Sequence, residues 1–150
     1  MKRFHFPLRP VAVIRAHKEM RAREAFAASV HAYVQTEERL ASTRVRVAEL
    51  ERLLFIGRSE RFVAADAAAL FRVYRTECHA ELETEREVIA ARDTMNLRRA
   101  EYIEANRQLK IIHRLEEKAR YKNRMENAKI EQNELDEFAG YRASRRPALS

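Results

Sequence analysis

Apolar residues recur at alternating spacings of three and four along most of the chain, and charged residues fill the positions between them. The longest such run extends from Asp66 to Gly140 and contains no proline, and no glycine before its last residue. This spacing predicts an α-helix that buries one narrow stripe against a partner helix. A continuous helix over the run would be about 110 Å long, too long for a compact domain of this size. The stripe consists of Phe71, Tyr74, Cys78, Leu82, Ile89, Met95, Tyr102, Leu109 and Ile112.

The first half of the chain carries a second stripe that can serve as the partner. Its large members stand seven residues apart, at Phe26, Tyr33, Leu40, Val47 and Leu54, with Val30 and Leu50 at interleaved positions. Glu37 and Arg44 fall at interleaved positions that would ideally be apolar. Polar residues in such a seam weaken it and can fix its register.

Stop signals separate the two helices. Gly57 directly follows an apolar cluster, which predicts a left-handed C-cap there, and Ser59 or Asp66 could cap the start of the next helix. Gly140, followed by Pro147, repeats the stop signal. The predicted fold is all-α, a long antiparallel two-helix coiled-coil hairpin with a C-terminal helical overhang. Its segments are an irregular N-terminus (1–9), a first helix (10–56), a turn (57–65), a second helix (66–140) and a disordered basic tail (141–150).

The hairpin implies a specific pairing between the helices. A fold about residues 60 to 61 places Leu50 opposite Phe71, Val47 opposite Tyr74, Leu40 opposite Leu82, Phe26 opposite Met95, and Met20 opposite Tyr102. By the same pairing, the first helix, which starts near Pro10, reaches only to about Ile111. We therefore expect the stretch from His113 to Arg142 to lack an intramolecular partner, apart from a folded-back N-terminal segment with Phe4, Phe6 and Leu8.

This overhang is where we expect function to reside. It keeps an apolar stripe at three-four spacing, made of Tyr121, Met125, Ala128, Leu135 and Phe138, with Gln132 at the missing place. At about 25 cal/mol per Å², leaving the stripe in water forgoes several kcal/mol of burial. Two occupants fit the pattern, a partner protein or a second copy of this chain.

Composition and charge narrow the class of protein. The chain has 150 residues, 35% of them charged, with two glycines, three prolines and no tryptophan, which is typical of long helices. The single Cys78 excludes an intramolecular disulfide, and we find neither a signal peptide nor a membrane span, so we expect a soluble cytosolic protein. The net charge of +7 is concentrated at the two ends of the chain.

The sequence argues against catalysis and against a bound metal or cofactor. The five histidines never lie three or four residues apart, and Cys78 cannot share a helix face with the adjacent His79. Two glycines cannot form a phosphate-binding loop. Carboxylates on exposed helix faces lack the burial that general acid or base chemistry requires. We therefore expect a protein that is not an enzyme.

Both ends of the chain resemble a known family. The opening FHFPLRPVAVIR, residues 4–15, resembles the Phe-x-Phe-x-Leu-x-x-Val start of the flagellar export protein FliJ. The segment EQNELDEFA, residues 131–139, resembles the Glu-Gln-x-x-x-Asp-Glu-x-Ala close of the same family. The resemblance implies a stalk-like hairpin of the flagellar type III export apparatus, in the cytoplasm and peripheral to the inner membrane. Its partners would be the hexameric export ATPase FliI, the gate protein FlhA and export chaperones.

The resemblance also implies where these partners bind. The ATPase contact would be made by Phe4, Phe6, Leu8, Val11, Glu131, Gln132, Asp136, Glu137 and Ala139, to which the overhang stripe adds Tyr121, Met125, Leu135 and Phe138. In the family the gate contact lies early in the second helix, where this chain has Phe71, Tyr74 and Cys78. These three also fit simple packing in the helix seam, and both interpretations stay open from the sequence.

Two alternative functions also fit the sequence. The sequence pI near 9.9 and the basic ends are typical of nucleic-acid binding, although apolar residues interrupt the basic positions of the first helix. We favour a protein that binds no nucleic acid and does not insert into the membrane. The equivalent stalk of a type III secretion injectisome would share the mechanism, and the terminal motifs favour the flagellar system.

Overall fold

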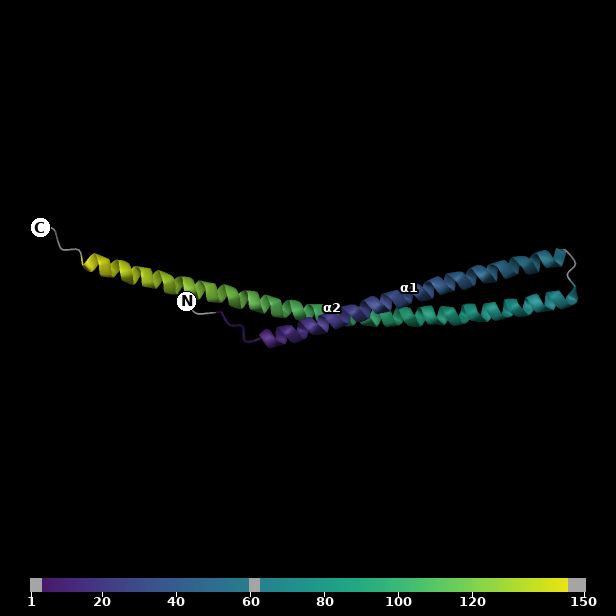
Figure 1. Ribbon diagram of the computed structural model, residues 1–150, viewed down its shortest axis with the longest axis horizontal. Helices are drawn as coiled ribbons and strands as arrows, with labels where there is room; N and C mark the ends of the chain where they lie inside the picture. Colours follow the sequence, from purple (N-terminus) through teal and green to yellow (C-terminus); the bar gives the residue numbers. More distant parts are fainter. Residues whose placement is uncertain (1–3, 60–62, 146–150) are drawn as a thin grey trace. The chain divides into compact units, whose positions relative to one another are not determined.

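The computed structural model describes residues 4–59 and 63–145. These residues form two helices, α1 (Arg9–Ser59) and α2 (Ala64–Ser144), and no strand (Figure 1). The predicted all-α helical hairpin is confirmed. By its internal contacts the chain divides into two units. We call residues 20–104 the hairpin unit, and residues 4–19 with 105–145 the terminal unit.

In the hairpin unit, the two helices run antiparallel and bury one seam between them. The α1 side of the seam contains the predicted large residues, with Leu40 and Val47 buried and Phe26, Tyr33 and Leu54 half-buried. On α2, Tyr74, Cys78, Met95 and Tyr102 are half-buried as predicted, whereas Phe71, Leu82 and Ile89 are exposed and their assignment to the seam was wrong. Leu70, Thr84, Val88 and Ala91 take the seam positions instead.

Small and hydroxylated residues alternate with the large ones along α1. The interleaved positions are held by Ser29, Thr36 and Thr43, and the predicted placement of Glu37 and Arg44 there was wrong by one residue. Buried hydroxyl groups need hydrogen-bond acceptors. Thr43 Oγ1 donates to the Arg39 carbonyl at 2.9 Å, so the seam tolerates this hydroxyl. Small side chains here let the two helix backbones approach each other.

Ion pairs flank the seam on both sides. Arg39 pairs with Glu87 on one side. On the other, Arg44 bridges Glu81 at 3.2 Å and Glu85 at 2.9 Å. Exposed pairs of this kind contribute only about 0.2 to 1 kcal/mol each. Their main effect is to favour one register and the antiparallel direction.

The register differs from the predicted one. The ring of Phe26 stacks on Tyr102 with centroids 6.0 Å apart, where Met95 was predicted. Tyr74 Oη donates to the Glu51 carboxylate at 3.0 Å, where Val47 was predicted. The pairing therefore differs from the predicted one by seven residues at Phe26 and by four residues at Tyr74.

Both glycine stop signals were misassigned. Gly57 is a buried residue inside α1, and Gly140 lies inside α2. The Val63 carbonyl accepts hydrogen bonds from the amides of Asp66 and Ala67 at 3.0 and 3.1 Å, so Val63 begins the first turn of α2. Asp66 lies in that turn, where its charge favours the helix dipole. Part of the predicted turn (60–62), of the N-terminus (1–3) and of the tail (146–150) lies outside the described residues.

The ends of the chain depart from the prediction in a similar way. The helix α1 begins at Arg9 with Pro10 in its first turn, where proline is tolerated because its missing amide has no helical partner. The helix α2 continues to Ser144, so residues 141–144 of the predicted disordered tail are helical. Over the described ranges, neither helix contains a segment apolar enough to cross a membrane.

Two valines on α1 test the seam. Val47 is 7% exposed and Val45 is 59% exposed. We expect Val47→Asp to destabilise the hairpin by about 2 to 4 kcal/mol, because it places a carboxylate among apolar groups. Val45→Asp makes the same chemical change in water and should alter stability by about 0.5 kcal/mol at most. Urea denaturation followed by circular dichroism measures both, and equal losses would contradict the seam.

Gly140 provides a second test. A Cβ added at Gly140 would meet no atom within 4 Å. Because the residue is helical, Gly140→Ala should stabilise the end of α2 by about 1 kcal/mol. Amide hydrogen exchange over residues 134–144 should slow in this variant and quicken in the control, Ala139→Gly. Faster exchange in Gly140→Ala would instead indicate the left-handed cap expected from the sequence.

Candidate functional site

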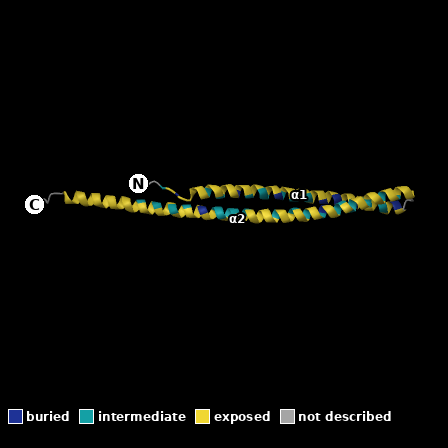
Figure 2. Cartoon of the chain, turned by 90° about the horizontal axis from the view of Figure 1, so that it is seen from below, coloured by how far each residue is buried: buried dark blue, intermediate teal, exposed yellow. Residues whose placement is uncertain are grey.

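The end of α2 is the most exposed part of the terminal unit. Every residue from Ala128 to Arg145 is exposed, and Figure 2 shows this segment exposed along its length. Pairs four residues apart support the helix just before it, since Arg120 binds Glu116 at 2.7 Å and the Asn127 side-chain amide donates to Asn123 at 3.2 Å. This segment is therefore a free helical surface.

The predicted apolar stripe lies on this surface and on the turns before it. Tyr121, Met125, Leu135 and Phe138 are all exposed, Leu135 to 67%. Ala128 and Gln132 are exposed between them, as are the predicted contact residues Glu131, Asp136, Glu137 and Ala139. This exposure agrees with the prediction that no other part of the chain packs on the stripe. That these residues contact an ATPase stays a prediction.

Two arginine–aromatic contacts at the end of α2 were not predicted. The Arg142 guanidinium lies 5.9 Å from the centroid of the Phe138 ring, and that of Arg145 lies 4.7 Å from the centroid of Tyr141. Such contacts contribute about 0.5 to 1 kcal/mol at exposed sites. The signal in the sequence was the spacing of four residues from each ring to its arginine. The pairs extend the surface beyond Ala139.

The N-terminal segment packs on an earlier part of α2. Phe6 is 6% exposed and Ile112 is 3% exposed, which makes them the most buried apolar side chains of the terminal unit. The Arg120 guanidinium lies 5.3 Å from the centroid of the Phe4 ring. Leu8 and Val11 are exposed. Of the four predicted N-terminal contact residues, Phe6 is therefore hidden, and its role in the free chain is to hold the segment on α2.

Charge strengthens this attachment. The hydrogen bond from Arg120, and then the charges of Arg120, Arg9 and His113, lower the pKa of the Glu116 carboxyl. A second link joins the helices where the Arg15 guanidinium donates to the Gln108 carbonyl at 3.0 Å. The two terminal motifs are thus separated along α2, because Glu131 lies about 16 Å beyond Arg120 at about 1.5 Å per residue.

The described residues of these surfaces give no indication of a metal site. Across residues 4–59 and 63–145, no cluster of three or more His, Cys, Asp and Glu side chains could hold a metal ion. What the terminal unit offers is an exposed helix with apolar, acidic and arginine-rich positions. Such a surface can bind another protein.

A family model described as flagellar FliJ protein matches residues 4–148. The chain belongs to the FliJ family. It is therefore a component of the flagellar export apparatus. No curated protein and no solved structure matched the chain.

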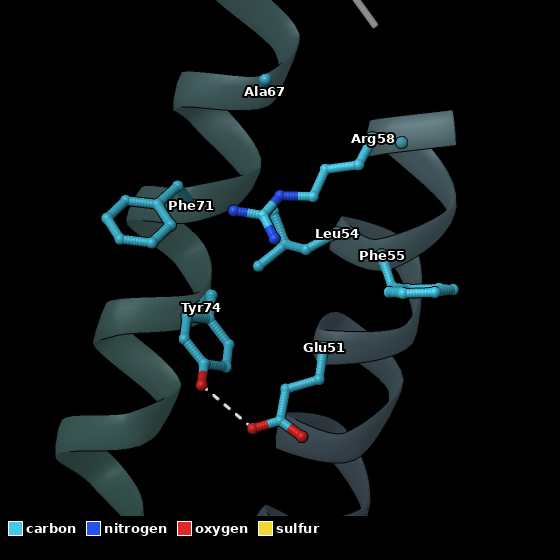
Figure 3. A pocket seen from close by; sticks show the side chains of 8 residues that line it. Glu51, Leu54, Phe55, Arg58, Ala67, Phe71 and Tyr74 are labelled. Atoms are coloured by element: carbon cyan, nitrogen blue, oxygen red, sulfur yellow. Dashed lines mark hydrogen bonds between the residues drawn. The ribbon is translucent and has the colours of Figure 1, made fainter. Parts of the chain in front are cut away.

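A groove near the end of the hairpin unit includes two of the three predicted gate-contact residues of this FliJ protein (Figure 3). It has a volume of about 810 Å³ and is lined by Glu51, Leu54, Phe55, Gly57, Arg58, Ala67, Phe71 and Tyr74. Phe71 is 52% exposed, so its packing role in the seam is excluded. Tyr74 and Cys78 are half-buried and do belong to the seam. A gate contact through these residues stays a prediction.

Among the residues that line this groove, Tyr74 has a strongly raised pKa. The neighbouring Cys78 thiol, and then the Glu51 carboxylate that accepts its hydrogen bond, raise the pKa of Tyr74 from 10.0 to about 12. A phenolate at Tyr74 would lose the hydrogen bond that it donates to Glu51 and would be repelled by that carboxylate, so the neutral tyrosine is favoured. The Glu51–Tyr74 hydrogen bond thereby joins α1 to α2 beside the groove, as Figure 3 shows.

This pair predicts a pH dependence. The folded-state pKa of Tyr74 lies above its unfolded value, so its contribution to stability is complete below about pH 10 and is lost as pH rises towards 12. We expect Glu51→Gln to lower the pKa of Tyr74, while Glu49→Gln on an exposed face leaves it unchanged. An alkaline titration followed by NMR of the tyrosine ring carbons measures this. An unaltered Tyr74 pKa in Glu51→Gln would contradict the assigned hydrogen bond.

Proposed function

We propose that this FliJ protein acts as a central stalk of the flagellar export ATPase. The end of α2 inserts along the axis of the hexameric ATPase FliI and makes or breaks no covalent bond. The observation that supports this is the exposed helix from Ala128 to Arg145 with its apolar stripe. An apolar stripe gains free energy when a surrounding surface removes it from water. The inner surface of a ring of ATPase subunits could cover the stripe in this way.

The charges on this helix suggest how a stalk could act on a ring. Around the stripe, carboxylates such as Glu131 and Asp136 occupy the middle of the segment, and Arg142 and Arg145 occupy its end. A single helix presents different side chains to each subunit of a symmetric ring. Unequal contact biases which subunit closes on nucleotide, because a ligand shifts a conformational equilibrium only through differential contacts.

The N-terminal motif has a divided role in this proposal. Phe6 anchors the segment against α2, and exposed Leu8 and Val11 remain available to the ring. Phe4 lies between these roles, half-buried under Arg120. The anchored segment thickens the stalk at the level of Ile112 to Arg120, while the helix beyond it stays single.

The hairpin unit would carry the second contact of the stalk. In the groove beside Phe71, Leu54 and Arg58 point from α1 towards α2, and the Arg58 side chain reaches towards Phe71 (Figure 3). An exposed aromatic residue next to a groove is a frequent protein-binding feature. We assign this groove to the gate protein FlhA, and we propose that export chaperones are also handled by the hairpin.

The stripe is tested by a matched pair of substitutions. Leu135→Asp places a negative charge within the stripe, and Asn133→Asp places the same charge about half a turn away on the same helix. We expect Leu135→Asp to weaken binding to the cognate ATPase about tenfold or more and to reduce its stimulation accordingly. Asn133→Asp should retain stimulation within about a factor of three.

A chain ending at Asn127 supplies the baseline for this assay, because it keeps every half-buried residue of the terminal unit. Circular dichroism should show that the shortened chain retains the rest of its helix. Full stimulation by the shortened chain, or by Leu135→Asp, would show that the end of α2 is not the part that acts on the ATPase.

A further inference from the structure

On α2, exposed positions with the spacing of the stripe continue beyond it towards both ends of the terminal unit. They lie on the side of the helix opposite to its contact with α1. In the terminal unit, burial on α2 marks Ile112, Glu116 and Ala119 as the side that packs on the start of the chain. A second set of positions follows the same three-four spacing about half a turn away, and its members are Ile111, Arg114, Lys118, Tyr121, Met125, Ala128, Gln132, Leu135, Ala139 and Arg142. All ten are exposed. This set has the spacing of a second coiled-coil seam.

We propose that a second copy of this chain occupies this seam in the free protein. The two α2 helices would pair antiparallel about a two-fold axis that passes midway between Met125 and Ala128, so that Met125 lies opposite Ala128 of the second copy. Such an interface is isologous, so each helix supplies both halves of the contact. The seam is the part of α2 from Ile111 to Arg142.

The charge distribution along α2 supports a second copy as the occupant. Within the seam, residues 114–124 contain five basic side chains (Arg114, Lys118, Arg120, Lys122 and Arg124) and two acidic ones (Glu116 and Glu117). Residues 129–139, which lie opposite them in the proposed register, contain four acidic side chains (Glu131, Glu134, Asp136 and Glu137) and one basic one, Lys129. Antiparallel pairing sets each basic stretch against the acidic stretch of the other copy, whereas parallel pairing sets like charges together.

The flanking positions make this complementarity specific. With Met125 opposite Ala128, Lys122 comes opposite Asp136 and Arg124 comes opposite Glu131 of the second copy. The hairpin unit uses equivalent flanking positions for its pairs Arg44–Glu85 and Arg39–Glu87. Lys122 is available for such a pair, because its contact with Glu126 on the same helix is 3.9 Å long and its side chain is 80% exposed.

The composition of the seam makes the pairing weak and reversible. Arg114, Lys118 and Gln132 interrupt the apolar positions, and polar residues in a seam lower its stability while fixing its register. The contribution from exposed charge pairs falls with added salt. The dimer would cover the stripe that we assign to the ATPase, so entry into the ring requires its dissociation. This last consequence rests on the proposed function, whereas the pairing itself does not.

Two charge-reversal variants of the full chain test the pairing. Lys122→Glu with Arg124→Glu, and Glu131→Lys with Asp136→Lys, each set like charges against each other in their own dimer. Sedimentation equilibrium of the wild-type chain should show a concentration-dependent dimer that salt weakens. Each variant alone should weaken the dimer about tenfold or more. An equal mixture of the two should recover it, because their charges are again complementary.

A control variant, Glu134→Lys with Glu137→Lys, makes the same change in net charge as Glu131→Lys with Asp136→Lys, on sides of α2 turned away from the stripe. Its dimer should stay within about threefold of the wild type. Two results would overturn the proposal. One is a wild-type chain that sediments as a monomer over the whole concentration series at low salt, and the other is a mixture that forms no more dimer than its components. Neither measurement requires the ATPase, so its outcome is independent of the proposed function.

Discussion

The alternation of large and small side chains in the seam is the constraint on which the hairpin unit depends. A two-helix coiled coil has no third layer, so each seam residue is covered from one direction only. Large residues such as Leu40 and Val47 supply the buried apolar area, and Thr43 between them lets the backbones come close. Because the Thr43 hydroxyl donates a hydrogen bond to a carbonyl of its own helix, the seam accepts it without an unpaired polar group. Ion pairs at the flanks then select the direction and the register.

How much of this fold could be predicted depends on the range of the interactions involved. The helices and the large seam residues of α1 follow from periodicity, which is local. Register does not, because it depends on contacts between residues far apart in the chain, such as that of Phe26 with Tyr102. The sequence rule for Gly57 favoured a cap, whereas in the structure this residue is buried inside α1. Phe71 was assigned to the seam wrongly because it stands next to Leu70, and the three-four spacing alone did not decide which of the two faces α1.

For the candidate site, too, features that depend on local sequence could be predicted, and features that depend on contacts between distant residues could not. Exposure of Tyr121, Met125 and Leu135 followed from a count of available partner residues, and the structure agrees with that count. The sequence allowed the N-terminal segment to fold back on α2, but it could not tell that Phe6 is the buried residue of the three while Leu8 stays exposed. The contacts of Arg142 and Arg145 with aromatic rings depend on α2 continuing past Gly140, where the sequence rule predicted its end.

A helix with two seams on opposite sides has to use them differently. On α2 of the terminal unit, the seam that faces Phe6 is closed by the chain itself, and Ile112 there is nearly inaccessible. The other seam has polar residues at Arg114, Lys118 and Gln132, so no partner can close it as firmly. A surface of moderate affinity would suit the exchange that we propose between a second copy and the ATPase, since a tightly closed seam would dissociate too slowly. The same interruptions divide the apolar residues of this surface into smaller patches, which lowers the tendency of an exposed helix to aggregate.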